Sequence, residues 1–170
     1  MDYAYHTVDV FTQAAYSGAQ ISVFPHAVGL DECQMQLIAK EMNHPETVFI
    51  FPGGSDVAAE LRVFSPSGER TVGSHSVVAA ARTLVHSNAL PVGERDCVVH
   101  FSQGPKIFDV VLSQKDGRLL TQLSMSVIPQ IDRYVPDNNE LQQVLGLGPN
   151  DIETLKAKTL FVSCDTPYLI

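Results

Sequence analysis

"TVGSHSVVAAARTLVHS", residues Thr71–Ser87, carries the strongest fold signal in the chain. The run from Ala79 to Ala81 and Leu84 favour a helix, and apolar residues surround the axis of that helix instead of forming one stripe. Arg82 is the only residue there with a permanent charge. Such a helix has no face suited to water, so we predict that Ser74 to Ser87 forms a helix buried nearly all round.

The segments around this helix predict strands. VAAELRVFS, residues 57–65, alternates apolar residues on one face with a mixed set on the other, as a strand does. ETVFIF (46–51), DCVVHFS (96–102) and KIFDVVLSQKDGRLLTQLSMS (106–126) are of the same kind, and a hairpin turn at Asp116 and Gly117 divides the last. We therefore predict an α+β fold in which a curved, mainly antiparallel sheet wraps the central helix.

Two further segments predict amphipathic helices. In DECQMQLIAKEMN (31–43), Asp31 is a candidate N-cap with Gln34 at the third helical position, and the helix should end before Pro45. In PDNNELQQVLGLG (136–148), Asp137 and Gly146 mark the start and the stop. The final segment TLFVSCDTPYLI, residues 159–170, predicts a strand that reaches the last residue.

The composition restricts the class of protein. The 170 residues are 45% hydrophobic and 18% charged, and 11 Lys and Arg against 19 Asp and Glu give a net charge of −8, which argues for a globular protein and against nucleic-acid binding. We expect no export signal and no membrane span, because no apolar run reaches about 18 residues. Cys33, Cys97 and Cys164 lack a metal-type spacing and predict small buried side chains in a reducing cytoplasm.

The start of the central helix could carry chemistry. Gly73, Ser74 and His75 would place free backbone N–H groups, a hydroxyl and an imidazole at one helix N-terminus, which suits an anion. The plainer alternative is that Ser74 only caps the helix. A hydrolase that uses Ser74 or Ser76 with a histidine is a weaker alternative, because no nucleophile elbow surrounds either serine.

Glu46 stands between the first helix and a buried strand, where it is either a solvated residue or a functional carboxylate. Three segments, "VDVFT" (8–12), "NHPETVF" (43–49) and "FSPSGERTVGSHSVVAAA" (64–81), bear on this choice by their order and spacing. Together they resemble the phenazine-biosynthesis PhzF-like family, whose members have VDAFT-like, NxSETxF-like and FTPxxEVxxCGHATxAAA-like segments. The resemblance runs over all 170 residues.

This resemblance implies a fold similar to that of diaminopimelate epimerase and a set of site residues. Glu46 would be a catalytic acid/base that moves a proton, together with His75, and the two should lie close together at one mouth of the sheet. Gly73, Ser74 and Ser76 would bind a small anionic substrate, and Gly73 stands where the epimerase has a thiol. The implied reaction requires no metal and no organic cofactor, and Glu69 matches a family position that we interpret as structural.

The resemblance also implies a domain division. Residues 1–118 would form the first PhzF-like domain, and residues 119–170 the beginning of a second, similar but truncated domain. Open sheet edges should then lead to a homodimer or a larger assembly. Because half of the family's cleft would be missing, a non-catalytic binding or regulatory remnant is the alternative function.

Overall fold

The computed structural model describes residues 2–93, 95–115, 117–124, 128–153, 156, 158–163 and 167–170. The chain forms two compact units, Met1–Met125 and Ser126–Ile170. The first unit includes strand β8 (Arg118–Ser124), which pairs antiparallel with β7 (Lys106–Lys115). The division therefore lies after β8, whereas the sequence-based boundary at residue 118 falls at the start of that strand. That the second unit begins a second, similar domain stays a prediction.

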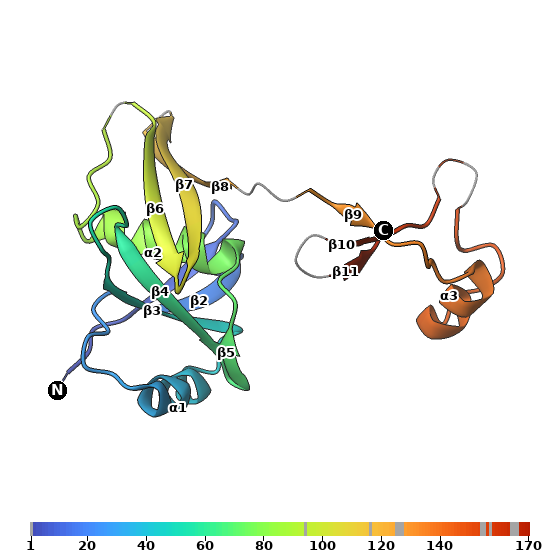
Figure 1. Cartoon of the computed structure of the whole chain (residues 1–170), viewed down its shortest axis with the longest axis horizontal. Coiled ribbons are helices and arrows are strands. Elements are labelled where there is room, and N and C mark those ends of the chain that lie inside the picture. Colours follow the sequence, from blue (N-terminus) through green and yellow to red (C-terminus); the bar gives the residue numbers. More distant parts are fainter. Residues whose placement is uncertain are drawn as a thin grey trace. The chain divides into compact units, whose positions relative to one another are not determined.

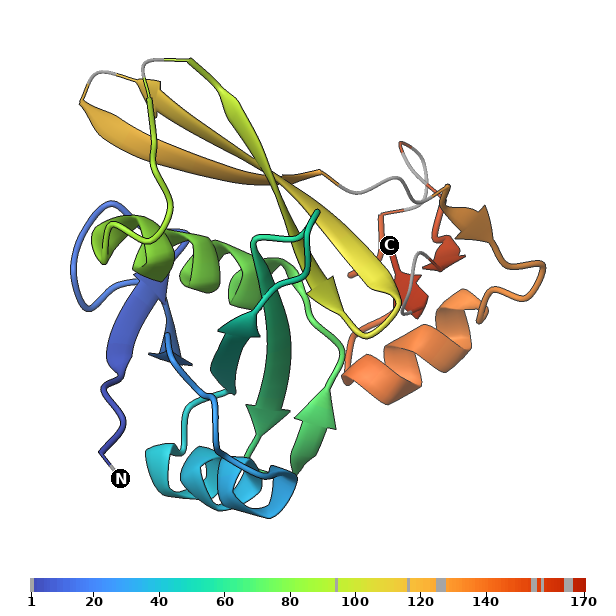
Figure 2. The ribbon, with the colours of Figure 1, turned by 60° about the vertical axis from the view of Figure 1, so that its left-hand side comes forward.

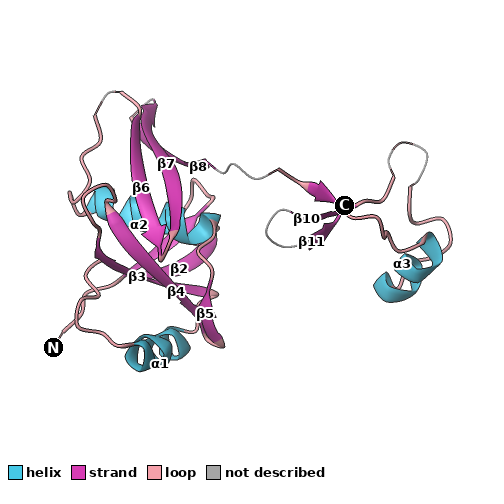
Figure 3. Cartoon of the chain, viewed as in Figure 1, coloured by secondary structure: helices cyan, strands magenta, loops and turns pink. Residues whose placement is uncertain are grey.

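The first unit contains one mixed sheet of eight strands (Figures 1 and 3). The other six strands are β1 (His6–Val10), β2 (Ala19–Phe24), β3 (Glu46–Pro52), β4 (Ala59–Ser65), β5 (Gly68–Arg70) and β6 (Cys97–Gln103). The order is β1-β2-β3-β4-β6-β7-β8, with β5 paired to β4. The pairs β2–β3 and β4–β6 are parallel and the others are antiparallel, so the prediction of a mainly antiparallel sheet is confirmed.

Helix α2 (Ser74–His86) fills the concave side of this sheet, as Figure 2 shows. It contacts β1, β2 and β3 near one end of the strand order and β7 and β8 at the other, so the sheet must curl around it. Val77 and Ala79 to Ala81 are fully buried, as predicted from their all-round apolar pattern. One stripe departs from that pattern, because His75, Arg82 and His86 are exposed and Val78 is half-buried.

Parallel pairing between β4 and β6 joins two parts of the sheet. Only two pairs of residues are in register there, Ala59 with Phe101 and Glu60 with Ser102. One more backbone bond, from Ala58 N–H to the His100 carbonyl at 2.8 Å, extends the junction. Since α2 contacts β3 on one side of it and β7 on the other, the packing of α2 supports this short junction.

Helix α1 (Glu32–Met42) covers the opposite face of β3 and β4. Strand alternation supplies both cores: Phe49 faces α1 in a cluster with Met35, while its neighbour Val48 belongs to the core around α2. The predicted capping box is confirmed, since Asp31 accepts from Gln34 N–H at 2.8 Å and the Gln34 side chain accepts from Asp31 N–H at 3.0 Å. The helix ends at Met42, before a left-handed Asn43.

The second unit contains α3 (Asn138–Leu145) and a small antiparallel sheet of β9 (Gln130–Ile131), β10 (Phe161–Ser163) and β11 (Pro167–Leu169). The predicted caps at Asp137 and Gly146 are confirmed. The single strand predicted for 159–170 is wrong, because β10 and β11 are separate strands that pair with each other. Two neighbouring strands can satisfy each other's backbone groups, which one strand alone cannot do.

Two sequence-based expectations concern the chain as a whole. Among the described residues, no helix is both long and apolar enough to cross a membrane. The prediction of buried cysteines is wrong for Cys33, which is exposed in the first turn of α1, and Cys97 is half-buried. Cys164 lies outside the described residues.

Candidate active site

Glu46 is the first residue of β3, and its side chain meets α2. The chain turns out of α1 at Asn43 (φ 51°) and enters β3 after Pro45, in parallel register with β2, where Ile21 is the partner of Glu46. The Ser76 hydroxyl donates a hydrogen bond of 2.6 Å to Glu46 Oε2. This bond ties a carboxylate at the edge of the core to the first turn of the central helix.

The N-terminus of α2 offers unpaired donors. Gly73 is the N-cap residue and no side chain caps the helix, so the alternative in which Ser74 serves as the cap is wrong. The first helical bond runs from Val77 N–H to the Gly73 carbonyl at 3.1 Å. Among the described residues, nothing accepts a hydrogen bond from the backbone N–H groups of residues 74 to 76. These groups and the helix dipole give this end a partial positive charge.

His75 lies beside an aromatic ring that the sequence did not single out. Its exposed imidazole meets the Phe11 ring edge to face, with centroids 4.9 Å apart and an angle of 88° between the planes. Phe11 is 64% exposed and has φ 58°, a left-handed backbone that is costly for a bulky residue. Phe11 belongs to the VDVFT segment that contributes to the family resemblance, but the sequence did not predict a role for this residue.

The structure therefore places the predicted site residues at one end of α2. Gly73 and Ser74 are half-buried at the helix start, and the Ser76 side chain is completely buried. The hydroxyl of Ser76 donates to Glu46, and the whole residue, backbone included, is buried. Glu46 bonds Ser76, the residue that follows His75 in the first turn of α2, and no hydrogen bond joins Glu46 to His75 directly among the described groups. That the two side chains act at one site stays a prediction.

Glu69 lies at the approach to this turn and makes an ion pair. Arg62 donates from Nε to Glu69 Oε1 at 2.8 Å and from Nη2 to Oε2 at 2.7 Å. Its Nη2 also reaches Glu32 of α1 at 3.0 Å. The hydrogen bond from Arg62 holds the pKa of Glu69 below its ordinary value, and the same pair raises the pKa of Arg62. This contact joins β4, β5 and α1, which is consistent with a structural role.

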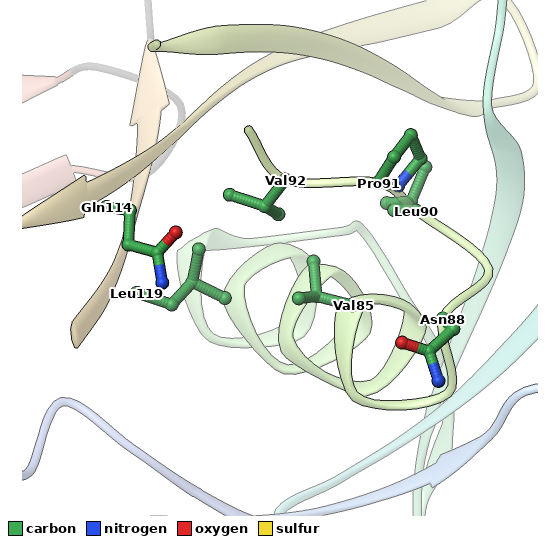
Figure 4. A pocket seen from close by; sticks show the side chains of 7 residues that line it. All are labelled: Val85, Asn88, Leu90, Pro91, Val92, Gln114 and Leu119. Carbon is green, nitrogen blue, oxygen red and sulfur yellow. The ribbon is translucent and has the colours of Figure 1, made fainter. Parts of the chain in front are cut away.

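Two hollows lie along the exposed stripe of α2. A pocket of about 430 Å³ at the C-terminal end of the helix has apolar walls from Val85, Val92 and Leu119, with the Gln114 amide among its lining groups (Figure 4). A larger groove of about 660 Å³ lies between the β1 and β8 sides of the sheet and includes Arg82. Neither hollow is lined by a predicted site residue, but the larger one is lined by Phe11, whose ring meets that of His75. No group of three metal-binding side chains occurs within the described ranges.

Comparisons with known proteins identify relatives. A family model described as "Phenazine biosynthesis-like protein" matches residues 8–166. An uncharacterized isomerase of Pasteurella multocida is 33% identical over 159 residues, covering 88% of this chain and 49% of the relative. The chain spans about half the length of the curated relatives that it matches.

Solved structures share the fold. The crystal structure of a PhzF-family phenazine biosynthesis protein from Bacillus anthracis has a TM-score of 0.86 at 20% identity, covering 99% of this chain and 55% of the other. A hydroxyproline epimerase of Agrobacterium vitis has a TM-score of 0.52 at 17% identity, covering 67% of this chain and 40% of the other. The expectation of an epimerase-like α+β fold is thus confirmed.

Proposed function

The chain belongs to the phenazine biosynthesis-like family, and we propose that it acts as an isomerase. In this proposal Glu46 is the acid/base that moves a proton on a small anionic substrate. The contact between Glu46 and Ser76 carries this proposal, because it holds a carboxylate against the first turn of α2. Curated relatives named as isomerases support the reaction class.

The chemistry needs one group that acts first as a base and then as an acid. The Glu46 carboxylate takes a proton from a substrate carbon, and the electron pair of the broken C–H bond moves into the substrate's unsaturated system as an enolate or dienolate. The protonated Glu46 then returns the proton to a different carbon on the same face of the substrate. No electrons are gained or lost, so the reaction is an isomerisation.

The two oxygens of Glu46 have different surroundings. Oε2 accepts the Ser76 hydroxyl, and no described residue donates a hydrogen bond to Oε1. We assign proton transfer to Oε1, since the tether on Oε2 restricts the carboxylate and leaves the lone pairs of Oε1 available. A fixed base of this kind reduces the loss of orientational freedom at the transition state.

The anionic part of the substrate has a matching environment. The backbone N–H groups of the half-buried Ser74 and the exposed His75 lie at the helix start, where they and the helix dipole favour negative charge. His75 is exposed beside them, so its imidazole can donate to a substrate oxygen. These groups would stabilise the negative charge that develops as the carbon loses its proton.

Solvent-proton exchange tests this proposal. The purified chain is incubated in D₂O with a panel of unsaturated cyclic carboxylic acids, and deuterium incorporation is followed by NMR. We expect incorporation with the wild-type chain and none with Glu46→Gln. Glu41→Gln, at an exposed position of α1, is the matched control and should retain it. Carboxylate binding without any exchange would instead favour the non-catalytic binding function.

A further inference from the structure

Gln103, the last residue of β6, holds the loop that leads into α2. Its side-chain oxygen accepts a hydrogen bond from Val72 N–H at 2.8 Å, and its side-chain nitrogen donates to the Arg70 carbonyl at 2.9 Å. One amide thus satisfies two backbone groups of a segment that lies 31 to 33 residues away in sequence. No signal in the sequence distinguishes this glutamine from the others.

The geometry points to Gln103 as a positioning residue for the first turn of α2, which is the new inference here. The loop between Arg70, at the end of β5, and the N-cap Gly73 is short, and Val72 within it is 5% exposed. With Arg70 and Val72 both bound to one amide, the path of the backbone into Gly73 is fixed. The directions of the N–H groups of residues 74 to 76 follow from that path.

Gln103 belongs to the β6–β7 hairpin. It pairs with Lys106 at the closed end of the β6–β7 hairpin, whose turn contains a left-handed Gly104 (φ 54°). Phe101, two residues earlier, is completely buried against the core. The amide is therefore presented from a strand that reaches into the core, and its nitrogen can donate while its oxygen accepts.

The inference rests on the proposed function in one respect, since the placement of the first turn matters only if that turn holds an anion.

Two variants separate the contributions of the amide. Gln103→Leu removes both bonds, and Gln103→Glu keeps an acceptor for Val72 while facing the Arg70 carbonyl with an oxygen. Gln36→Leu is the matched control, because the Gln36 side chain also bonds two backbone groups, donating to the carbonyls of Ser65 and Pro66 at 3.0 and 3.2 Å, but in a different loop.

The experiment uses the full chain, ¹⁵N-labelled, with inorganic phosphate as the probe. We expect phosphate to shift the amide signals of residues 74 to 76, and Gln103→Leu to weaken phosphate binding about five-fold, the loss of roughly one hydrogen bond. Gln103→Glu should weaken binding at least as much, and Gln36→Leu should change it less than two-fold. Equal weakening in Gln103→Leu and Gln36→Leu would overturn the inference, since general destabilisation would then explain it.

A second readout keeps the inference separate from the proposed function. If wild-type phosphate titration leaves residues 74 to 76 unshifted, the proposed anion site fails. The inference is then decided on the free protein, by comparing amide shifts and hydrogen exchange of residues 70 to 76 between wild type and Gln103→Leu. Changes concentrated in these residues, and absent from Gln36→Leu, support the positioning role. Signals at 74 to 76 that match those of the wild type reject it.

Discussion

The Ser76 hydroxyl lies 2.6 Å from Oε2 of Glu46, a hydrogen bond between residues 30 apart in sequence. Ser76 is completely buried, and Glu46 is partly exposed at the start of β3. Since the bond has an ionisable acceptor, it belongs to the stronger class of side-chain hydrogen bonds. It also means that a change at either residue alters the surroundings of the other.

A double-mutant cycle measures this coupling. Ser76→Ala should lower the free energy of unfolding by about 1 kcal/mol at neutral pH, because the partly exposed carboxylate recovers some hydration when it loses its donor. In a Glu46→Gln background the same change should cost less, giving a coupling energy of roughly 0.5 to 1 kcal/mol. Urea denaturation of the four proteins provides the values. Strictly additive costs would show that the bond contributes nothing to folding.

Overpacking at Ala80 tests the burial of α2. Ala80 is 0% exposed inside the curled sheet, so Ala80→Leu has no space to enter and should cost about 1 to 3 kcal/mol of unfolding free energy. Lys40→Leu, at an exposed position of α1, is the control and should stay within about 0.5 kcal/mol of wild type. Thermal or urea unfolding followed by circular dichroism is sufficient. An unchanged midpoint for Ala80→Leu would contradict the packing described for α2.

The Arg62–Glu69 pair predicts a dependence of stability on pH. Because the pKa of Glu69 lies below its ordinary value of 4.5, the pair contributes stability above that pH, and the contribution is lost as the pH falls through the lower, folded-state value. Arg62 stays charged throughout this range. With the Glu69 side chain 37% exposed, solvent screening limits the effect, and Glu69→Gln should cost about 0.5 kcal/mol at neutral pH.

Urea titrations at a series of pH values check this prediction. The difference between wild type and Glu69→Gln should shrink as the solution becomes more acidic than pH 4.5. The control variant Glu41→Gln should show no such convergence. A difference that stays constant into strong acid would mean that the ionised pair is not its source.

Self-association is expected from the second unit. Among its described residues Leu141 is the one buried apolar side chain, while Ile131, Val144 and Tyr168 are 64%, 83% and 58% exposed. Surfaces of this kind, next to short strands with unpaired edges, favour contact with a second copy. Sedimentation velocity should show a mass that increases with concentration, and Tyr168→Lys should reduce that increase. A monomer at every concentration would count against the proposed assembly.

Local sequence patterns accounted for most of the first unit. Three patterns each depend on residues close together in sequence, so they can be recognised without knowledge of the fold. They are the apolar run in α2, the capping box at Asp31 and the alternation in β4. No strand was predicted for Gly68 to Arg70, although these residues form β5 by pairing with β4. A strand of three residues has too few positions for its alternation to be recognised.

The candidate site was less predictable, because its contacts cross long stretches of sequence. Glu46, His75 and the substrate-binding role of Ser76 were named from the family resemblance, which did not predict the hydrogen bond between Ser76 and Glu46. Gln103 was missed altogether, since its bonds to the α2 approach exist only once β6 lies parallel to β4. The exposed stripe of α2 likewise depends on where the sheet stops curling, which no local pattern encodes.

The short β4–β6 junction has a consequence for the order of folding. Strands β6 to β8 form a meander of neighbouring segments, and local contacts of this kind form quickly. Joining that meander to β4 requires closure of a long loop that contains α2, which costs chain entropy. Only two pairs of residues between β4 and β6 are gained in return. The meander should therefore be a separate cooperative unit that opens at a lower free energy than the rest, while amides in the middle of α2 exchange only when both halves of the sheet come away from it.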